Sequence, residues 1–152
     1  YLNKPNNENT SAMCMAANLS GEAISISKTT APHAVSYPFT SLFNISHGHA
    51  VSLTLNKFLK FNYENFERAD CNFDIKKRYK TIFDLTNSKN INSLDRYLLE
   101  IKKQAKLEDN LDKLGINLKN NYSRIIAGIN IQRLANNPIK LDQNDISKIL
   151  FK

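Results

Sequence analysis

The three histidines of this 152-residue sequence, His33, His47 and His49, all lie in one short window between Lys28 and Val51. Imidazole is the commonest metal ligand among protein side chains and a frequent proton carrier near neutral pH. A single histidine usually makes ordinary hydrogen bonds, but three in one window, beside breaks in the helical pattern, favour a metal or proton-transfer site. The remainder of the sequence reads mainly as the scaffold that holds this window.

Two histidines on separate elements could place their ring nitrogens about 2 Å from one divalent cation. A complete site needs further ligands, normally another histidine or a carboxylate. No HExxH or DxxxH pattern occurs in the sequence. Either acidic residues of this chain complete the set or residues upstream of Tyr1 do. We favour the second, because Tyr1 is not an initiator methionine and the chain reads as a piece of a longer protein.

The elements around the window are predicted to be helices. Small and apolar residues at helical spacing predict a buried helix over 12–26. A second helix should cover 32–43 and carry His33, with Pro38 kinking it or ending it early. A third should begin near His47 and run to about residue 62, so that two helix starts present two imidazoles.

The rest of the chain continues the helical pattern. Amphipathic spacing and capping residues predict helices over 75–85, 93–106, 111–116, 122–134 and 142–150. With only 4 Gly and 4 Pro, the sequence lacks the many turns of a barrel or sandwich. The predicted fold class is therefore all-α, a bundle of about six to eight helices that forms one domain over residues 1–152.

The net charge of +7 could attract nucleic acid or an anionic membrane. However, the lysines and arginines are interspersed with acids, as on solvated helix faces, and no aromatic-interleaved basic motif is present. No apolar run approaches the about 20 residues of a membrane span, and Cys14 and Cys71 suggest no disulfide framework. We expect a cytoplasmic protein with no nucleic-acid or membrane partner; a homodimer stays open.

Two segments of the window resemble a known family. The sequences HAVSYP at 33–38 and FNISHG at 43–48 are similar to the C-terminal metal-binding signature of the iron-containing (group III) alcohol dehydrogenases. The pairs Asn-Pro at 137–138 and Asp-Ile at 145–146 are similar to the terminal segment of that family. The resemblance therefore covers nearly the whole chain.

This resemblance implies a two-domain architecture like that of dehydroquinate synthase. An N-terminal α/β domain, absent from this chain, would bind NAD(P)H, and a C-terminal all-helical domain would hold a divalent metal, Fe²⁺ or Zn²⁺. By motif match, His33 and His47 are two of four metal ligands, and the other two, an Asp and a His, would lie upstream of Tyr1. The implied reaction interconverts a small alcohol and an aldehyde, and the chain alone should be inactive.

Many members of the family carry a second histidine four residues after the first ligand, where this sequence has Tyr37. A tyrosine hydroxyl can still hydrogen-bond, so Tyr37 and the additional His49 are the candidate catalytic residues for proton transfer. For His49, a structural position that points away from the metal is an equal alternative.

The longer pattern over 28–51 resembles most the subgroup that contains phosphonoacetaldehyde reductases, whose product is 2-hydroxyethylphosphonate. Lys28 and the hydroxyls of Thr29 and Thr30 could bind a phosphonate substrate beside a helix start. With equal weight, Lys28 is a solvated loop lysine and the threonines are helix caps.

Two other interpretations stay open. The first is a stand-alone helical binding or interaction module whose histidines are structural. The second is a relative of dehydroquinate synthase or glycerol-1-phosphate dehydrogenase, because those enzymes also combine a nucleotide domain with a metal domain. The length of the encoded protein separates the first of these from the dehydrogenase hypothesis.

Overall fold

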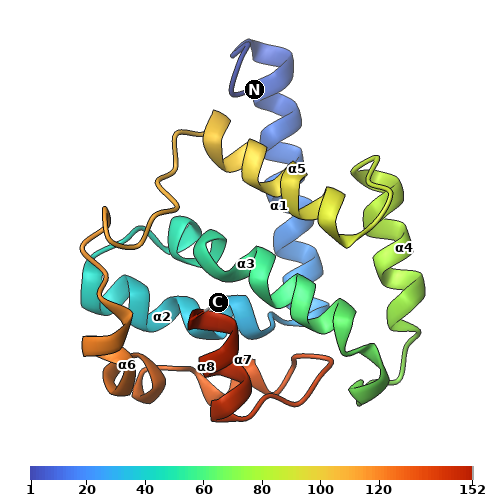
Figure 1. Ribbon diagram of the computed structural model, residues 1–152. Coiled ribbons are helices and arrows are strands. Elements are labelled where there is room, and N and C mark those ends of the chain that lie inside the picture. The colour runs from blue at the N-terminus through green and yellow to red at the C-terminus, as the bar shows by residue number, and fades with distance from the viewer. Residues whose placement is uncertain (152) are drawn as a thin grey trace.

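A computed structural model describes residues 1–151 and confirms the all-α prediction. These residues form eight α-helices and one 3₁₀ helix, which in chain order are α1 (Asn7–Ser27), α2 (Ala31–Phe43), α3 (His47–Glu64), η1 (Phe66–Arg68), α4 (Ile75–Leu85), α5 (Ile91–Gln104), α6 (Leu118–Ala127), α7 (Ile131–Leu134) and α8 (Gln143–Phe151) (Figure 1). Within residues 1–151 the β pairing is limited to an isolated bridge between Ala69 and Ile139. None of the described helices combines the length and apolarity that a membrane crossing requires.

The main core lies between α2 and α3 on one side and α6 and α8 on the other (Figure 1). Its fully buried side chains include Val35, Phe39, Phe58 and Ile125. A second, smaller core joins the end of α3 to α4 and α5, and there the Tyr79 hydroxyl donates a 2.7 Å hydrogen bond to the Leu59 carbonyl. Helix α3, whose first turn carries His47, therefore contributes to both cores.

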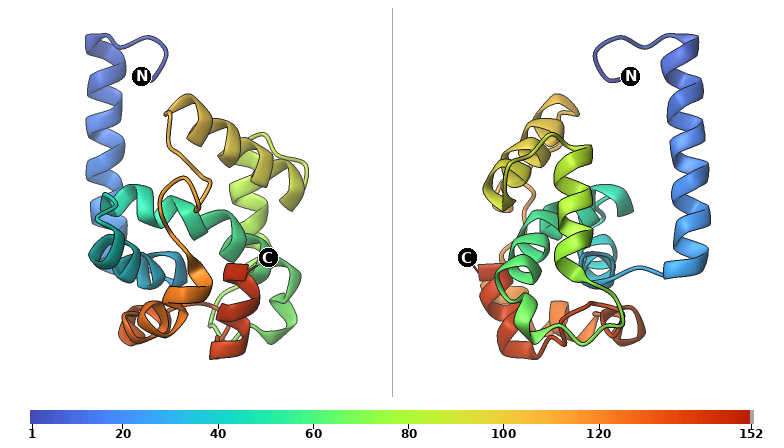
Figure 2. Two further views of the ribbon diagram at one scale, coloured as in Figure 1. Left: turned by 60° about the vertical axis from the view of Figure 1, so that its left-hand side comes forward. Right: turned by 90° about the vertical axis from the view of Figure 1, so that its right-hand side faces the viewer.

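Helix α1 stands apart from the rest of the bundle in the right-hand view of Figure 2. None of its residues is buried, and apolar side chains such as Met15, Leu19 and Ile26 are 67%, 56% and 84% exposed. The prediction that this segment is a buried helix is therefore wrong within residues 1–151. The apolar residues are real, but no described segment covers them, and an isolated helix that is apolar on several sides normally packs against other protein.

Pro38 lies inside α2 without ending it, contrary to one of the two predicted outcomes. A proline has no N–H, so the carbonyl of Ala34 loses its usual partner four residues along the helix. That carbonyl instead accepts a 3.3 Å hydrogen bond from the backbone N–H of Asn130. Gly128 lies against the proline, and a Cβ placed on it would be 2.9 Å from the Cβ of Pro38. The proline is thus the point where the α6–α7 turn contacts α2.

Two other predicted helices differ in the structure. The single helix expected over 122–134 is divided into α6 and α7, because the chain turns at Gly128 to reach α2. The short helix expected over 111–116 is a series of turns that ends at Gly115, whose φ is +71°. Helix α5 begins two residues before the predicted start at 93, because its N-cap is Asn90 and Ser93 is the reciprocal partner in the capping box.

The segment over 137–146 is held by two polar contacts. The side-chain amides of Asn62 and Asn137, both buried, exchange two 3.0 Å hydrogen bonds, and Asn137 also donates to the Ile139 carbonyl. Asp145 pairs with Arg68 at 2.7 Å. These contacts fix the terminal segment to α3 and η1, so the Asn-Pro and Asp-Ile pairs serve the fold in this structure.

Candidate metal centre

The two histidines predicted as metal ligands face each other. His33 lies in the first turn of α2, and His47 is the first residue of α3. The connection between the helices reverses at Asn44, which adopts the left-handed conformation with φ +53° that asparagine tolerates well. As a result the Nε2 atoms of His33 and His47 are 3.0 Å apart. The structure thus brings together two residues fourteen positions apart in sequence.

This spacing fits two ligands of one cation. Tetrahedral coordination at the usual metal–nitrogen distance separates two ligand nitrogens by about 3.3 Å. The observed Nε2–Nε2 distance of 3.0 Å is close to that value. His33 is partly buried and His47 is exposed, so the face of the pair is open to additional ligands. The donor pair therefore suits a divalent metal such as Fe²⁺ or Zn²⁺.

Ser36 supports the orientation of His47. Its hydroxyl donates a 2.7 Å hydrogen bond to the His33 carbonyl and lies 3.5 Å from Nδ1 of His47. With the hydroxyl hydrogen used in that way, the serine oxygen can accept the Nδ1 hydrogen of His47. This tautomer leaves the Nε2 lone pair free for a metal, which is the usual role of a group behind a metal-binding histidine. Ser36 is fully buried, so its position is fixed by the core.

The histidine pair alone does not form a closed metal site. Among residues 1–151, no group of three or more histidine, cysteine or acidic side chains is placed to hold a metal. Burial lowers the pKa of His33, and the nearby His47 and Arg133 lower it further. A lowered pKa favours the neutral imidazole that metal binding requires. The pair therefore has the chemistry of ligands and the geometry of part of a site.

Tyr37 and Arg133 border the histidine pair. The ring centroid of Tyr37 is 5.9 Å from that of His33 and 5.6 Å from that of His47. Arg133 lies on α7, and its guanidinium carbon is 5.7 Å from the Tyr37 ring centroid. Sequence analysis identified Tyr37 but missed Arg133, because about a hundred positions and an incorrectly predicted helix separated it from the window. The signal available in the sequence was the charge of Arg133 within the mainly apolar segment 122–134.

The three residues predicted to bind a phosphonate have different surroundings. The ammonium of Lys28, an exposed residue, donates to the Ser25 carbonyl at the end of α1. Thr30 is the N-cap position of α2, although its side chain makes no capping hydrogen bond. The hydroxyl of Thr29 accepts a 2.8 Å hydrogen bond from Arg133. The structure therefore connects Thr29, rather than Lys28, to the Arg133 guanidinium that borders the histidine pair.

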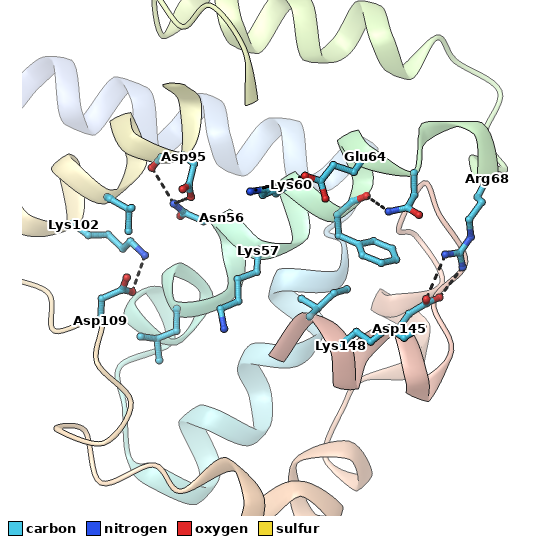
Figure 3. A pocket seen from close by; sticks show the side chains of 15 residues that line it. Asn56, Lys57, Lys60, Glu64, Arg68, Asp95, Lys102, Asp109, Asp145 and Lys148 are labelled. Atoms are coloured by element: carbon cyan, nitrogen blue, oxygen red, sulfur yellow. Dashed lines mark hydrogen bonds and ion pairs between the residues drawn. The ribbon is translucent and has the colours of Figure 1, made fainter. Parts of the chain in front are cut away.

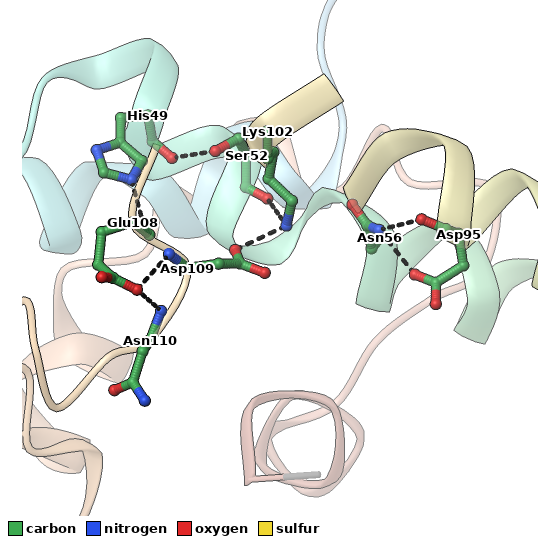
Figure 4. A network of polar contacts seen from close by, with 8 residues as sticks. All are labelled: His49, Ser52, Asn56, Asp95, Lys102, Glu108, Asp109 and Asn110. Atoms are coloured by element: carbon green, nitrogen blue, oxygen red, sulfur yellow. Dashed lines mark hydrogen bonds and ion pairs between the residues drawn. The ribbon is translucent and has the colours of Figure 1, made fainter. Parts of the chain in front are cut away.

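His49 contacts the segment that follows α5. Its Nε2 lies 2.7 Å from the Glu108 carbonyl, as Figure 4 shows, and must carry a hydrogen to donate to that oxygen. In the same network Lys102, which is 7% exposed, donates to Asp109 at 2.7 Å. This arrangement is one that a structural histidine makes, and the catalytic role of His49 stays a prediction.

A cleft of about 690 Å³ lies between α3, α5 and α8, and neither His33 nor His47 lines it (Figure 3). Its charges are largely paired with each other, as in Lys102–Asp109 and Arg68–Asp145. Burial lowers the pKa of Lys57 in this cleft, and its ammonium donates to the Leu150 carbonyl. The cleft therefore shows no arrangement of groups comparable to the histidine pair.

Residues 1–152 match the model of the Fe-containing alcohol dehydrogenase family, C-terminal. The chain belongs to that family, and the predicted resemblance is confirmed.

One curated relative is a phosphonoacetaldehyde reductase from Streptomyces viridochromogenes, which is 42% identical over 52 residues. The match covers 34% of this chain and 13% of that protein, so the chain corresponds to a small part of its length. No solved structure matches the chain.

Proposed function

We propose that this chain is the metal-binding domain of an NAD(P)-dependent alcohol dehydrogenase that acts as an aldehyde reductase. The observation that carries the proposal is the His33–His47 pair, with Nε2 atoms 3.0 Å apart at the start of two helices. Membership of the iron-containing alcohol dehydrogenase family supports the class of reaction. In this proposal the pair supplies two ligands to one Fe²⁺ or Zn²⁺ ion.

The remaining parts of the enzyme would come from upstream sequence. We propose an N-terminal α/β domain that binds NAD(P)H and contributes the other metal ligands. The exposed apolar side chains of α1 support this arrangement, because they need a covering surface that residues 1–151 do not provide. The chain on its own would then bind metal weakly and catalyse no reduction.

The chemistry follows from the position of the two imidazoles. A bound divalent cation supplies a Lewis acid for the aldehyde oxygen and for the negative charge that grows there. His33 and His47 would hold that ion through their Nε2 atoms, and the Ser36 oxygen, 3.5 Å from Nδ1 of His47, can accept the hydrogen of the tautomer that leaves Nε2 free. NAD(P)H, held by the upstream domain, would supply the hydride for the carbonyl carbon, and one proton from solvent would reach the oxygen, so that the products would be the alcohol and NAD(P)⁺. Tyr37, beside both imidazoles, is the proposed donor on that proton path.

For the substrate we propose a short aldehyde with a phosphonate group, namely phosphonoacetaldehyde, which would be reduced to 2-hydroxyethylphosphonate. The similarity of 52 residues to a phosphonoacetaldehyde reductase supports this choice. Lys28, Thr29 and Thr30, next to the first turn of α2, were selected from the sequence as the phosphonate-binding residues. Of these, Thr29 already contacts a guanidinium in the structure.

A turnover assay with the full-length parent tests the proposal. We expect oxidation of NADH or NADPH when phosphonoacetaldehyde is added to the Fe²⁺- or Zn²⁺-loaded protein, and no oxidation with the 152-residue chain. His33→Ala should abolish turnover in the parent, whereas Asn92→Ala, an exposed change on α5, should not. Reduction by the isolated chain, or unchanged turnover in the His33 variant, would contradict the proposal.

A further inference from the structure

Arg133 is unusual among the arginines of this chain. The other four, Arg68, Arg78, Arg96 and Arg124, are exposed, whereas Arg133 is partly buried. Within residues 1–151 no carboxylate lies within ion-pair distance of its guanidinium, although Arg68 has one in Asp145. A partly buried cation without an anionic partner is costly unless something else compensates its charge.

The guanidinium is held in place by neutral groups. One of its N–H groups donates to the Thr29 hydroxyl at 2.8 Å, and its plane lies near the Tyr37 ring. The backbone N–H of Arg133 donates to the Asn130 side chain, which caps α7. Asn136 ties the same helix to the Thr29 carbonyl. These contacts orient the side chain while four of its five N–H donors stay available for a ligand.

The docking of α7 on Pro38 explains why this cation lies at the histidine pair. The Ala34 carbonyl, freed by Pro38, binds the Asn130 N–H, and Gly128 allows the close approach. Both contacts come from α2, the helix that carries His33. Pro38 thus anchors both contacts, and they bring the guanidinium to one place beside the imidazoles.

A guanidinium beside a divalent cation repels it unless an anion lies near both. Guanidinium groups bind tetrahedral and planar oxyanions through paired N–H donors, with a geometry that lysine cannot reproduce. We propose that Arg133, oriented by Thr29, is the specificity-determining residue that binds the tetrahedral oxyanion of the substrate, a phosphonate or phosphate carried by a short aldehyde. The inference rests on the proposed function, and it moves the main charge contact from Lys28 to Arg133.

The test compares two aldehydes with the metal-loaded full-length enzyme. We expect Arg133→Ala to lower the ratio of kcat/KM for phosphonoacetaldehyde to that for propionaldehyde by about 10- to 100-fold, the effect of losing a charged hydrogen bond. Arg124→Ala, the matched control at an exposed arginine on α6, should leave the ratio within about twofold. Arg133→Lys should recover only part of the ratio, because it keeps the charge but loses the paired donors.

A binding measurement separates this inference from the proposed function. Methylphosphonate titrated into the same enzyme by calorimetry should bind at least tenfold more weakly to Arg133→Ala than to the unsubstituted protein, with unchanged metal content. If no aldehyde is reduced but this difference appears, the reductase proposal fails and the anion site stands. Equal losses for both aldehydes, unchanged methylphosphonate binding, or a change confined to the KM for the coenzyme would overturn the role of Arg133. Thr29→Val, which removes only the orienting acceptor, should show a smaller loss in the same direction and thus keeps the test valid if Arg133→Ala does not fold.

Discussion

Replacing Asn137 by alanine tests whether the terminal Asn-Pro segment serves the fold. Asn137 makes three side-chain hydrogen bonds, two with Asn62 at 3.0 Å and one to the Ile139 carbonyl at 2.8 Å. Asn62 and Asn137 are only 6% and 4% exposed, so water replaces these partners poorly. An unpaired buried polar group costs about 1–3 kcal/mol. Because the substitution leaves the Asn62 amide without its partner, we expect a loss of about 3 kcal/mol in the free energy of unfolding.

The assay is urea unfolding followed by circular dichroism, with a double-mutant cycle on the two asparagines. Asn62→Ala should cost less, about 2 kcal/mol, because Asn137 keeps its bond to the Ile139 carbonyl. The double variant should be more stable than the sum of the single losses predicts, by about 1–2 kcal/mol. Asn92→Ala, at an exposed position, should change stability by less than about 0.5 kcal/mol. Additive losses, or a loss at Asn137 no larger than the control, would refute this reasoning.

Three other perturbations follow from the structure. Gly128→Ala should lower stability by about 1–3 kcal/mol in a thermal melt, because its Cβ would lie 2.9 Å from the proline of α2; an unchanged midpoint would contradict the contact. The hydrogen bond from Arg68 lowers the pKa of Asp145, so this carboxylate stabilises the fold above its unfolded pKa of about 4 and loses that effect as pH falls through the lower folded value. Asp145→Asn should therefore make the free energy of unfolding depend less on pH at acid pH. If the variant and the unsubstituted protein lost stability in parallel as the pH falls, the role of Asp145 would be contradicted. Ser36→Ala should weaken metal affinity of the parent about 10- to 100-fold in a competition titration, since the group behind Nδ1 of His47 is lost; an unchanged affinity would remove Ser36 from the site.

The helices that depend on local patterns were predictable. The expected helix over 75–85 appears with those bounds as α4, because its apolar spacing is regular and Asp74 caps it by accepting from the Lys77 N–H. Helix α8 was also expected, and at its start the Asp142 carboxylate accepts a hydrogen bond from the Asp145 N–H. In these segments the residues that decide the structure are neighbours in sequence.

The departures come from contacts between distant residues. The division of the expected helix over 122–134 depends on the free Ala34 carbonyl, which no local pattern around Gly128 reveals. The apolar residues of α1 predicted a buried helix, but none of its residues is buried within residues 1–151. Whether the apolar residues of α1 are buried depends on the protein surface that contacts the helix, so the composition of the helix alone could not decide it.

The candidate site was only partly predictable. Two predicted helix starts could bring His33 and His47 together, and the family resemblance implied that both are metal ligands; the structure places their Nε2 atoms 3.0 Å apart. Arg133 reaches the same place through α7, and that depends on tertiary docking at Pro38. Ser36 could have been recognised, because a residue three positions after His33 lies on the same helix face. Sequence motifs thus identify the candidate ligands, whereas the approach of Arg133 to them depends on the packed structure.

The central claim is that His33 and His47 hold one divalent cation. Its most direct test is the metal content of the purified full-length parent, measured by plasma mass spectrometry for the unsubstituted protein and for single alanine variants of all three histidines. We predict about one Fe²⁺ or Zn²⁺ per chain in the unsubstituted protein and in His49→Ala, whose imidazole binds the Glu108 carbonyl instead. His33→Ala and His47→Ala should each lose tightly bound metal. Stoichiometric metal in both of these variants would contradict the claim.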